Sequence, residues 1–255
     1  MTESREVPVR KLVGTNYSRI LTYPVSNDAE VKARTEELAH AGVVSLHFDG
    51  HTMVGGIPVL GKGCVGIVTR AIFDGVPVAL KIRRTDADRS TMVDEGRLLR
   101  LANSVGVGPR LITATKNFLV MEFFDGIPLF RWAGELSPGD GVRVKRVLGQ
   151  LLRSCFSLDA MGLDHGELSH APKNVLVSRS NEPCIVDFES ASTTRRVANV
   201  TSLLQYFLFG KITRGVRRAV RFPNRRTVVR SLSQYKAQGS VESFQELLGL
   251  LGLSR

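Results

Sequence analysis

Residues 61–81 read GKGCVGIVTRAIFDGVPVALK and decide the expected fold. Three glycines in the spacing G-x-G-x-x-G-x-V lie between apolar runs, and the pair Asp74-Gly75 is typical of a tight turn between two strands. The stretch therefore predicts short antiparallel strands, with the glycines in a hairpin and not at the start of a helix. Bare backbone amides in such a hairpin can approach phosphate groups without Cβ atoms in the way. An ordinary tight hairpin would carry the same glycines.

A single lysine, Lys81, ends the apolar segment 78–81, thirteen residues after Val68. There its ammonium group can reach phosphates held by the glycine hairpin, although a lysine at a strand end is also a common surface residue. A helix is expected over 89–103, from apolar residues at mostly helical spacing. Glu95 lies on that helix, where it can pair with Lys81 and hold it extended, or simply face the solvent.

A second group of polar residues lies in segments 164–177, DHGELSHAPKNVLV, and 185–189, IVDFE. Both segments contain a short apolar run that predicts a β-strand. A loop that enters one strand and a carboxylate that leaves the next would bring Asn174 and Asp187 side by side. Oxygen ligands of this kind suit Mg²⁺, which bridges nucleotide phosphates. Taken singly, each of the two is also an ordinary polar turn residue.

In the order and spacing of these motifs, residues 60–205 resemble the protein-kinase superfamily. The resemblance implies an ATP site that the glycine hairpin covers, with the segment 121–123 beside the adenine. It implies that Mg²⁺ is bound by Asn174 and Asp187. The nucleotide-binding residues implied are Gly61, Gly63, Gly66, Val68, Ala79, Lys81, Glu95, Met121, Glu122 and Phe123. The catalytic residues implied are Glu167, Lys81 and Asp164.

The chain departs from typical kinases in its catalytic loop. His165-Gly166-Glu167 stands in place of His-x-Asp, so the expected base is a glutamate, with Asp164 as its rival. The step from Glu167 to Asn174 is two residues longer than the kinase pattern. Asp187-Phe188-Glu189 replaces Asp-Phe-Gly, and no Ala-Pro-Glu triplet or long activation segment follows. These features resemble most closely the predicted archaeal serine/threonine protein kinases, and also the RIO-type, aminoglycoside and choline kinases.

The expected fold class is α+β, a two-lobed protein-kinase-like fold with a small antiparallel-sheet N-lobe and a mainly helical C-lobe. We expect an N-terminal accessory segment over 1–50, the N-lobe over 51–125 and the C-lobe over 126–255. The expected strands are 43–48, three short antiparallel strands within 57–83, 110–114, 118–123, 175–177 and 184–186. The expected helices are 29–41, with Asp28 as its N-cap and Gly42 as its stop, 89–103, 142–163, 199–207 and 241–251.

The composition of the 255-residue chain is that of a globular protein, with 43% hydrophobic and 23% charged residues. No run reaches the roughly 18 apolar residues that span a bilayer, and residues 1–11 lack the apolar core of a signal peptide. We therefore expect a cytoplasmic protein with no membrane partner. Cys64, Cys155 and Cys184 lie far apart in the sequence and predict neither a disulfide framework nor a zinc site.

The net charge of +11 arises from one stretch of the chain. Between Ser190 and Val241 there are eleven bases and no acid, and five arginines from 214 to 225 recur mostly at intervals of three and four residues. On one helix up to Phe222 and its following turn, they would form a ridge. A positive ridge favours RNA or another polyanion as a partner of residues 195–236. The plain alternative is a set of solvated helix faces.

These observations support one leading hypothesis and two alternatives. The leading hypothesis is an ATP- and Mg²⁺-dependent atypical serine/threonine protein kinase, which acts on a hydroxyl group of a protein substrate. The first alternative is a small-molecule kinase or ATPase with the same site residues, because no peptide-binding segment follows Asp187. The second is a nucleotide-binding pseudokinase that serves as an assembly factor for RNA-containing particles.

Overall fold

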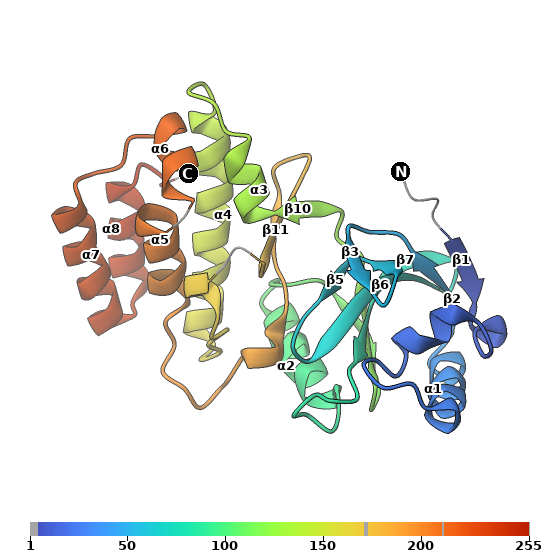
Figure 1. Cartoon of the computed structure of the whole chain (residues 1–255). Coiled ribbons are helices and arrows are strands. Elements are labelled where there is room, and N and C mark those ends of the chain that lie inside the picture. The colour runs from blue at the N-terminus through green and yellow to red at the C-terminus, as the bar shows by residue number, and fades with distance from the viewer. Residues whose placement is uncertain (1–4, 171–172, 211, 255) are drawn as a thin grey trace. The chain divides into compact units, whose positions relative to one another are not determined.

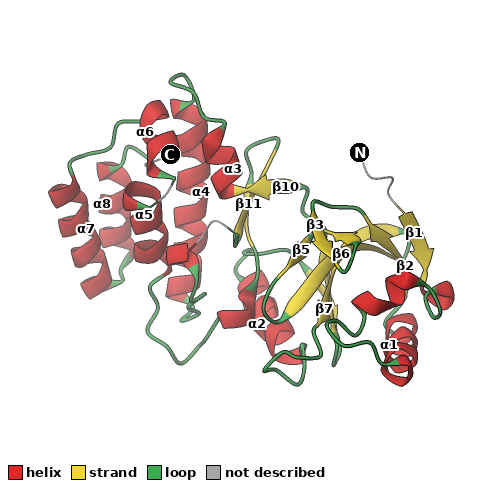
Figure 2. Ribbon diagram, in the orientation of Figure 1, coloured by secondary structure: helices red, strands yellow, loops and turns green. Residues whose placement is uncertain are grey.

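The computed structural model describes residues 5–170, 173–210 and 212–254. The chain forms two compact units: the first holds Met1–Arg100 and Pro109–Phe123, and the second holds Leu101–Gly108 and Phe124–Arg255. Antiparallel sheets and helices occur together, so the α+β fold class is confirmed (Figure 2). The two-lobed kinase-like fold stays a prediction. No helix among the described residues is long and apolar enough to cross a membrane.

The first unit is built on a seven-stranded antiparallel sheet in the order β1-β2-β6-β7-β9-β8, with β5 paired to β6 (Figure 1). Its strands are β1 (Arg5–Pro8), β2 (Val43–Phe48), β5 (Gly61–Lys62), β6 (Gly66–Phe73), β7 (Val76–Arg83), β8 (Leu111–Ala114) and β9 (Phe118–Glu122). A separate hairpin joins β3 (Thr52–Val54) to β4 (Ile57–Val59). The strands predicted at 43–48, 110–114 and 118–123 are confirmed to within one residue at each end, whereas β1 and β3 were not predicted. Three strands were predicted within 57–83, and the structure has four there, β4 to β7.

The β6–β7 hairpin follows from the turn Asp74-Gly75, whose φ angles are +49° and +73°. Two positive φ angles in a two-residue loop match the right-handed twist of the strands. β7 lies between β6 and β9, and both of its faces are buried. Val78 and Leu80 point to one face, and Lys81 points to the other at only 4% exposure. The lysine predicted at a strand end is therefore a buried residue of a central strand.

Residues 5–48 belong to the sheet unit, because they supply β1 and β2 and part of the same core. α1 (Asp28–His40) starts one residue earlier than predicted. Its N-cap is Asn27, not Asp28, and accepts a hydrogen bond from Glu30 N at 3.1 Å. Asp28 instead lies in the first turn, where the helix dipole favours a carboxylate. Gly42 follows the helix with φ +86°, so the predicted stop is confirmed.

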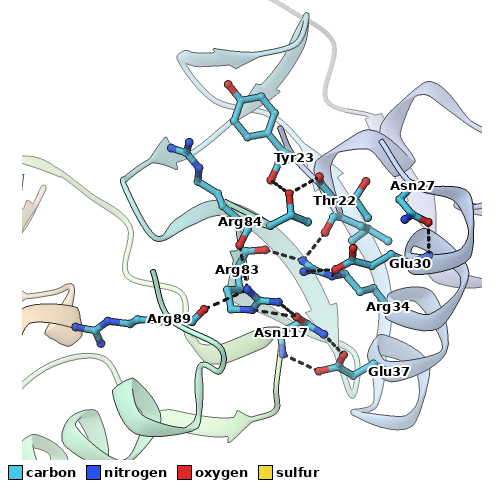
Figure 3. A network of polar contacts seen from close by, with 12 residues as sticks. Thr22, Tyr23, Asn27, Glu30, Arg34, Glu37, Arg83, Arg84, Arg89 and Asn117 are labelled. Atoms are coloured by element: carbon cyan, nitrogen blue, oxygen red, sulfur yellow. Dashed lines mark hydrogen bonds and ion pairs between the residues drawn. The ribbon is translucent and has the colours of Figure 1, made fainter. Parts of the chain in front are cut away.

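A buried arginine ties α1 to the sheet (Figure 3). Arg34 is only 1% exposed, and its Nη1 donates to the carbonyl oxygens of Leu21 and Arg83, both at 2.6 Å. Its Nε donates to Glu30 Oε1 at 2.9 Å, so the buried charge is paired as well as hydrogen-bonded. Arg83 is the last residue of β7, so this side chain fastens the N-terminal segment to the strand that carries Lys81.

The same network extends one turn further along α1 (Figure 3). Glu37 accepts hydrogen bonds from the backbone N–H of Asn117 at 2.8 Å and from its side-chain amide at 2.6 Å. The Oδ1 atom of Asn117 in turn accepts from Arg83 Nε at 3.1 Å and Nη2 at 2.8 Å. α1, the end of β7 and the turn before β9 are therefore held by one set of polar contacts.

α2 (Val93–Ser104) starts four residues later than predicted. Thr91 Oγ1 accepts a hydrogen bond from Val93 N at 3.2 Å, which satisfies one of the first amides of the helix. Gly96 faces the sheet, and a Cβ atom there would lie 2.5 Å from the Cβ of Ala114. Because Gly96 has no side chain, α2 can approach the sheet closely. The neighbouring Glu95 is brought close to the sheet in the same way.

The second unit is mainly helical and holds a small three-stranded sheet in the order β10-β11-β12. Its helices are α3 (Leu129–Gly134), α4 (Gly141–Ala160), α5 (Asn199–Phe209), α6 (Thr213–Ala219), α7 (Arg225–Gln238) and α8 (Val241–Leu250). Its strands are β10 (Gly126–Pro128), β11 (Val175–Ser178) and β12 (Pro183–Ile185). α5 packs on α4, and α8 packs on α7 (Figure 1). The helices predicted at 142–163, 199–207 and 241–251 and both predicted strands are confirmed, whereas β10 and α3 were not predicted.

The predicted arginine ridge does not lie on one helix, and this prediction is wrong. α6 ends at Ala219, and α7 starts only at Arg225. Pro223 separates the two helices, because proline has no N–H group to donate and disfavours helical backbone in the residue before it. Asn224 then caps α7 by accepting a backbone hydrogen bond at 2.9 Å. Lys211, one of the eleven bases, lies outside the described residues.

Arg34→Ala should lower the free energy of unfolding of the first unit by about 3 kcal/mol, because two buried carbonyl oxygens lose their donor and Glu30 loses its partner. Lys32→Ala, on an exposed position of the same helix, should change it by less than about 0.5 kcal/mol. Urea unfolding, read by amide hydrogen exchange of β7, measures both. Equal protection in the two variants would mean that the Arg34 contacts do not stabilise the sheet.

Candidate functional site

A lysine and a glutamate form a buried ion pair in the first unit. Lys81 Nζ lies 2.9 Å from Glu95 Oε1, and the two side chains are 5% and 3% exposed. Lys81 pairs in the sheet with Val68 of β6 and Leu119 of β9, so its backbone is fixed on both sides. The pairing of Lys81 with Glu95 is therefore present, and the role of the pair in binding phosphates stays a prediction.

The glycine-rich turn lies against this lysine. Gly63 N donates to Gly66 O at 2.8 Å and closes the turn that joins β5 to β6. A Cβ atom at Gly66 would lie 2.9 Å from Lys81 Cγ, whereas a Cβ atom at Gly61 would meet nothing within 4 Å. Gly66 is thus required by the packing of the lysine stem. At Gly63, a Cβ atom would lie 3.7 Å from Gly66 O, in ordinary contact, so of these three glycines only Gly61 borders open space.

The turn is also fastened from outside the motif. Arg84, three residues after Lys81, donates from Nη1 to Gly63 O at 2.9 Å and forms an ion pair with Asp86 at 2.6 Å. The hydrogen bond from Arg84 helps to lower the pKa of Asp86, and the same contact raises the pKa of Arg84. Tyr23, from the N-terminal segment, accepts a hydrogen bond from Lys62 Nζ at 2.6 Å.

The segment predicted to lie beside adenine is the end of β9. Met121 is 9% exposed and pairs with Ala79 of β7, so these two predicted residues are neighbours in the sheet. Glu122 is exposed, and its backbone N–H donates to Arg110 O at 2.9 Å. The ring of Phe123 lies 4.5 Å from the guanidinium carbon of Arg70. Contact of this segment with a nucleotide stays a prediction.

In the second unit, Glu167 is held by two donors. Ser190 Oγ donates to Glu167 Oε1 at 2.6 Å, and Asn174 Nδ2 donates to Glu167 Oε2 at 2.9 Å. The hydrogen bond from Ser190 and then that from Asn174 lower the pKa of Glu167, so the carboxyl group is ionised at neutral pH. Glu167 and Asn174, both singled out in the sequence, are thus brought together, and Ser190 joins them without any sequence motif to mark it.

Asn174 and Asp187 lie at the same end of the β11–β12 hairpin. Val186 N donates to Asn174 O at 2.9 Å, and Asp187 is the next residue along the chain. Asp187 has φ +69° and ψ +74°, a left-handed conformation that is uncommon for residues other than glycine. Strain of this kind is frequent at functional sites, where surrounding contacts hold it in place. An amide oxygen and a carboxylate here fit the hard oxygen donors that Mg²⁺ prefers.

Asp164, the rival base, is engaged in structural contacts. Its Oδ2 accepts a hydrogen bond from Arg195 Nε at 2.5 Å, and its Oδ1 accepts from Ala198 N at 2.9 Å. A Cβ atom on Gly166, which has φ +88°, would lie 2.3 Å from the same Arg195 guanidinium. Both oxygens of Asp164 thus already have donors, and the choice between Glu167 and Asp164 as the base stays a prediction.

A buried polar network behind the loop was not predicted from the sequence. Asn199 Oδ1 accepts from His165 N at 2.8 Å, while Asp159 Oδ1 accepts from both nitrogens of Asn199. Burial raises the pKa of Asp159, and Tyr235 donates to this carboxyl group from α7 at 2.9 Å. His165 is fully buried, and burial lowers its pKa, which favours the neutral ring. Its Nε2 atom lies 3.1 Å from Val186 O.

No protein-family model matches the chain, and no curated protein matches it either. The site residues therefore rest on the geometry of each unit and on the order of the motifs.

Ser190→Ala should raise the pKa of Glu167, because the hydrogen bond from Ser190 is the main interaction that favours the ionised carboxylate. With its folded pKa lowered, Glu167 contributes stability above its unfolded pKa that is lost as the pH falls through the folded pKa, and the variant should lose part of it. Carbon NMR titration of glutamate carboxyl groups, assigned with Glu167→Gln, measures the shift. Ser192→Ala is the matched control, since Ser192 hydrogen-bonds to Thr194 and Arg195 instead. An identical titration in Ser190→Ala and wild type would exclude this cause.

Proposed function

We propose that the protein is an ATP- and Mg²⁺-dependent phosphotransferase, an atypical serine/threonine protein kinase of the cytoplasm. The observation that carries the proposal is the buried Lys81–Glu95 ion pair, which lies against a glycine-rich turn. Two charges are rarely buried for stability alone, because removing them from water costs about as much as their attraction returns. Holding a lysine ammonium group in a fixed place for phosphate oxygens gives such a pair a purpose.

In this proposal, each half of the motif set has its own task. Lys81 holds phosphate oxygens, Glu95 keeps the lysine extended, and the glycines of the turn leave backbone amides accessible. Met121, Glu122 and Phe123 bind the adenine side of the nucleotide. The open space at Gly61 supports this, because glycine lets a ligand approach the backbone closely.

The catalytic part of the proposal lies on the loop of the second unit. Asn174 and Asp187 would hold Mg²⁺, which neutralises negative charge on the phosphates when it is bound. Glu167, ionised and fixed by Ser190 and Asn174, orients the acceptor hydroxyl group and accepts its proton. Phosphoryl transfer needs mostly positioning and charge neutralisation, so these few side chains suffice.

The acceptor in the leading proposal is a serine or threonine hydroxyl of a protein. One observation favours a small molecule or water as a second candidate: only eleven residues separate Asp187 from α5, which leaves no long segment to bind a peptide. A protein kinase transfers labelled phosphate to protein, whereas a small-molecule kinase or ATPase transfers it to a small molecule or to water. The pseudokinase alternative stays a hypothesis.

Lys81→Ala should lower transfer of labelled γ-phosphate from ATP by about a hundredfold or more, since preorganised charge of this kind typically contributes that much. This single change leaves the Glu95 carboxylate buried without its lysine, which can destabilise the fold. The double variant Lys81→Ala/Glu95→Gln removes both charges and is therefore measured beside it. Lys116→Ala, at an exposed position, is the control and should be fully active. The label is followed into protein, small molecules and inorganic phosphate, with and without RNA. Full activity of the double variant would end the kinase proposal.

Glu167→Gln should bind ATP like the wild type but turn over at least about tenfold more slowly, because the loss is that of a general base. Asp164→Asn should instead lower the melting temperature, since it weakens the ion pair between the buried Asp164 and the exposed Arg195, and keep most of the turnover per folded molecule. Nucleotide titration, calorimetry and initial rates separate the effects. The reverse pattern would assign the base to Asp164.

A further inference from the structure

A pocket of about 380 Å³ lies among α5, α6 and α7 of the second unit. Its lining includes three arginines, Arg217, Arg221 and Arg225, and two phenylalanines, Phe209 and Phe222. We call it the arginine pocket. The kinase proposal uses none of these residues.

Within the part of the chain that the structure describes, the three arginines of the pocket have no acidic partner. Across the described residues, no ion pair joins Arg217, Arg221 or Arg225 to a carboxylate. The sequence from Ser190 to Val241 contains no acid at all. Three like charges around one small pocket repel each other, and an anion between them removes this cost. The pocket therefore fits a ligand that carries negative charge.

The positive charge extends well beyond the pocket. Four more arginines of α6 and α7 are exposed: Arg214, Arg218, Arg226 and Arg230. A single phosphate group is satisfied by two or three donors, so seven exposed arginines exceed what a small anion can use. A chain of phosphates matches them better, because each repeat presents another charge.

The aromatic part of the lining decides which polyanion fits. Phe209 and Phe222 are half-buried, and the Arg225 guanidinium carbon lies 4.8 Å from the centre of the Phe209 ring. Flat apolar rings and guanidinium groups together are the surfaces on which unpaired bases stack. In a double helix the bases are already stacked and their faces are hidden. An acidic peptide or a sulfated sugar would bring charge but no flat face.

We propose that the arginine pocket binds single-stranded nucleic acid. The arginines contact successive phosphates, and one base enters the pocket against Phe222. Recognition is of backbone charge and of a base face, so it has little dependence on sequence. The start of α7 at Arg225 adds the positive end of a fourteen-residue helix to the same place. This inference does not rest on the phosphotransferase activity.

Fluorescence anisotropy with a labelled oligonucleotide of about twelve residues, over a salt series, tests the proposal with the full chain. Arg217→Glu/Arg221→Glu/Arg225→Glu should weaken binding at least about a hundredfold at low salt. It should also reduce the slope of log affinity against log salt by about two, at roughly 0.7 for each lost phosphate contact of a single strand. The charge-matched control Lys32→Glu/Arg97→Glu/Lys116→Glu, at exposed positions of the first unit, should bind within about threefold of wild type, for the same change in net charge.

A second variant separates base stacking from charge. Phe222→Ala should weaken binding about tenfold or more at every salt concentration and leave the slope unchanged, since stacking on one aromatic ring contributes about 1–3 kcal/mol. If the triple arginine variant fails to fold, as judged by its circular dichroism, Arg217→Gln/Arg221→Gln/Arg225→Gln takes its place with the same expected loss.

Three results would overturn the proposal. Equal loss of affinity in the pocket variant and the control variant would mean that only net charge matters. Tighter binding of a duplex than of a single strand would exclude base stacking. Competition by inorganic phosphate or free nucleotide as strong as that by the oligonucleotide, per mole, would leave a small-anion site. Glu167→Gln should bind the oligonucleotide like wild type, so loss of phosphotransfer and loss of binding can be told apart.

Discussion

The buried ion pair between Lys81 and Glu95 is the interaction around which the first unit is organised. Two charges inside a protein are tolerated only when they meet each other closely, which they do at 2.9 Å. That requirement reaches into the neighbouring strand and helix. Gly66 has no side chain where the lysine stem passes, and Gly96 has none where α2 comes against the sheet. Small residues at these two places are therefore consequences of the buried pair and of the close helix.

In the second unit, the polar side chains that the structure describes at the candidate site are held in place mainly by hydrogen bonds, without a central buried ion pair among them. Its segment from 164 to 170 is held by groups that lie elsewhere in the chain: Ser190 on Glu167, Arg195 on Asp164, and Asn199 on the backbone of His165. Asp159 closes the network by capping the first amides of α5 from outside that helix. These side chains have no contact with substrate in the proposed function, but they fix the position of the loop residues that the proposal places at the substrate.

Much of the fold could be predicted from local sequence, and the failures have physical causes. The turn at Asp74-Gly75 and strand 43–48 follow from short-range patterns, and the Lys81–Glu95 pair followed from motif order. β1 and β10 were missed because their pairing partners, β2 and β11, lie far along the chain and no local pattern links them. Ser190 is selected by a contact in three dimensions that no spacing rule contains. The arginine ridge failed for another reason: its helix was expected to run to Phe222, directly before Pro223, whereas α6 already ends at Ala219.

The two acidic candidates of the loop show why position in a motif does not decide a role. Asp164 accepts from Arg195 and from Ala198 N and is 5% exposed, so both of its oxygens already have partners that cannot leave without cost. Glu167 also has two partners, yet one of them is a serine hydroxyl, the same chemical group as a serine or threonine acceptor. An incoming hydroxyl could replace Ser190 on Glu167 Oε1 with one hydrogen bond lost and one gained. Of the two carboxylates, only Glu167 has a hydroxyl group among its described donors, and this contact supports its place as the base in the proposed reaction.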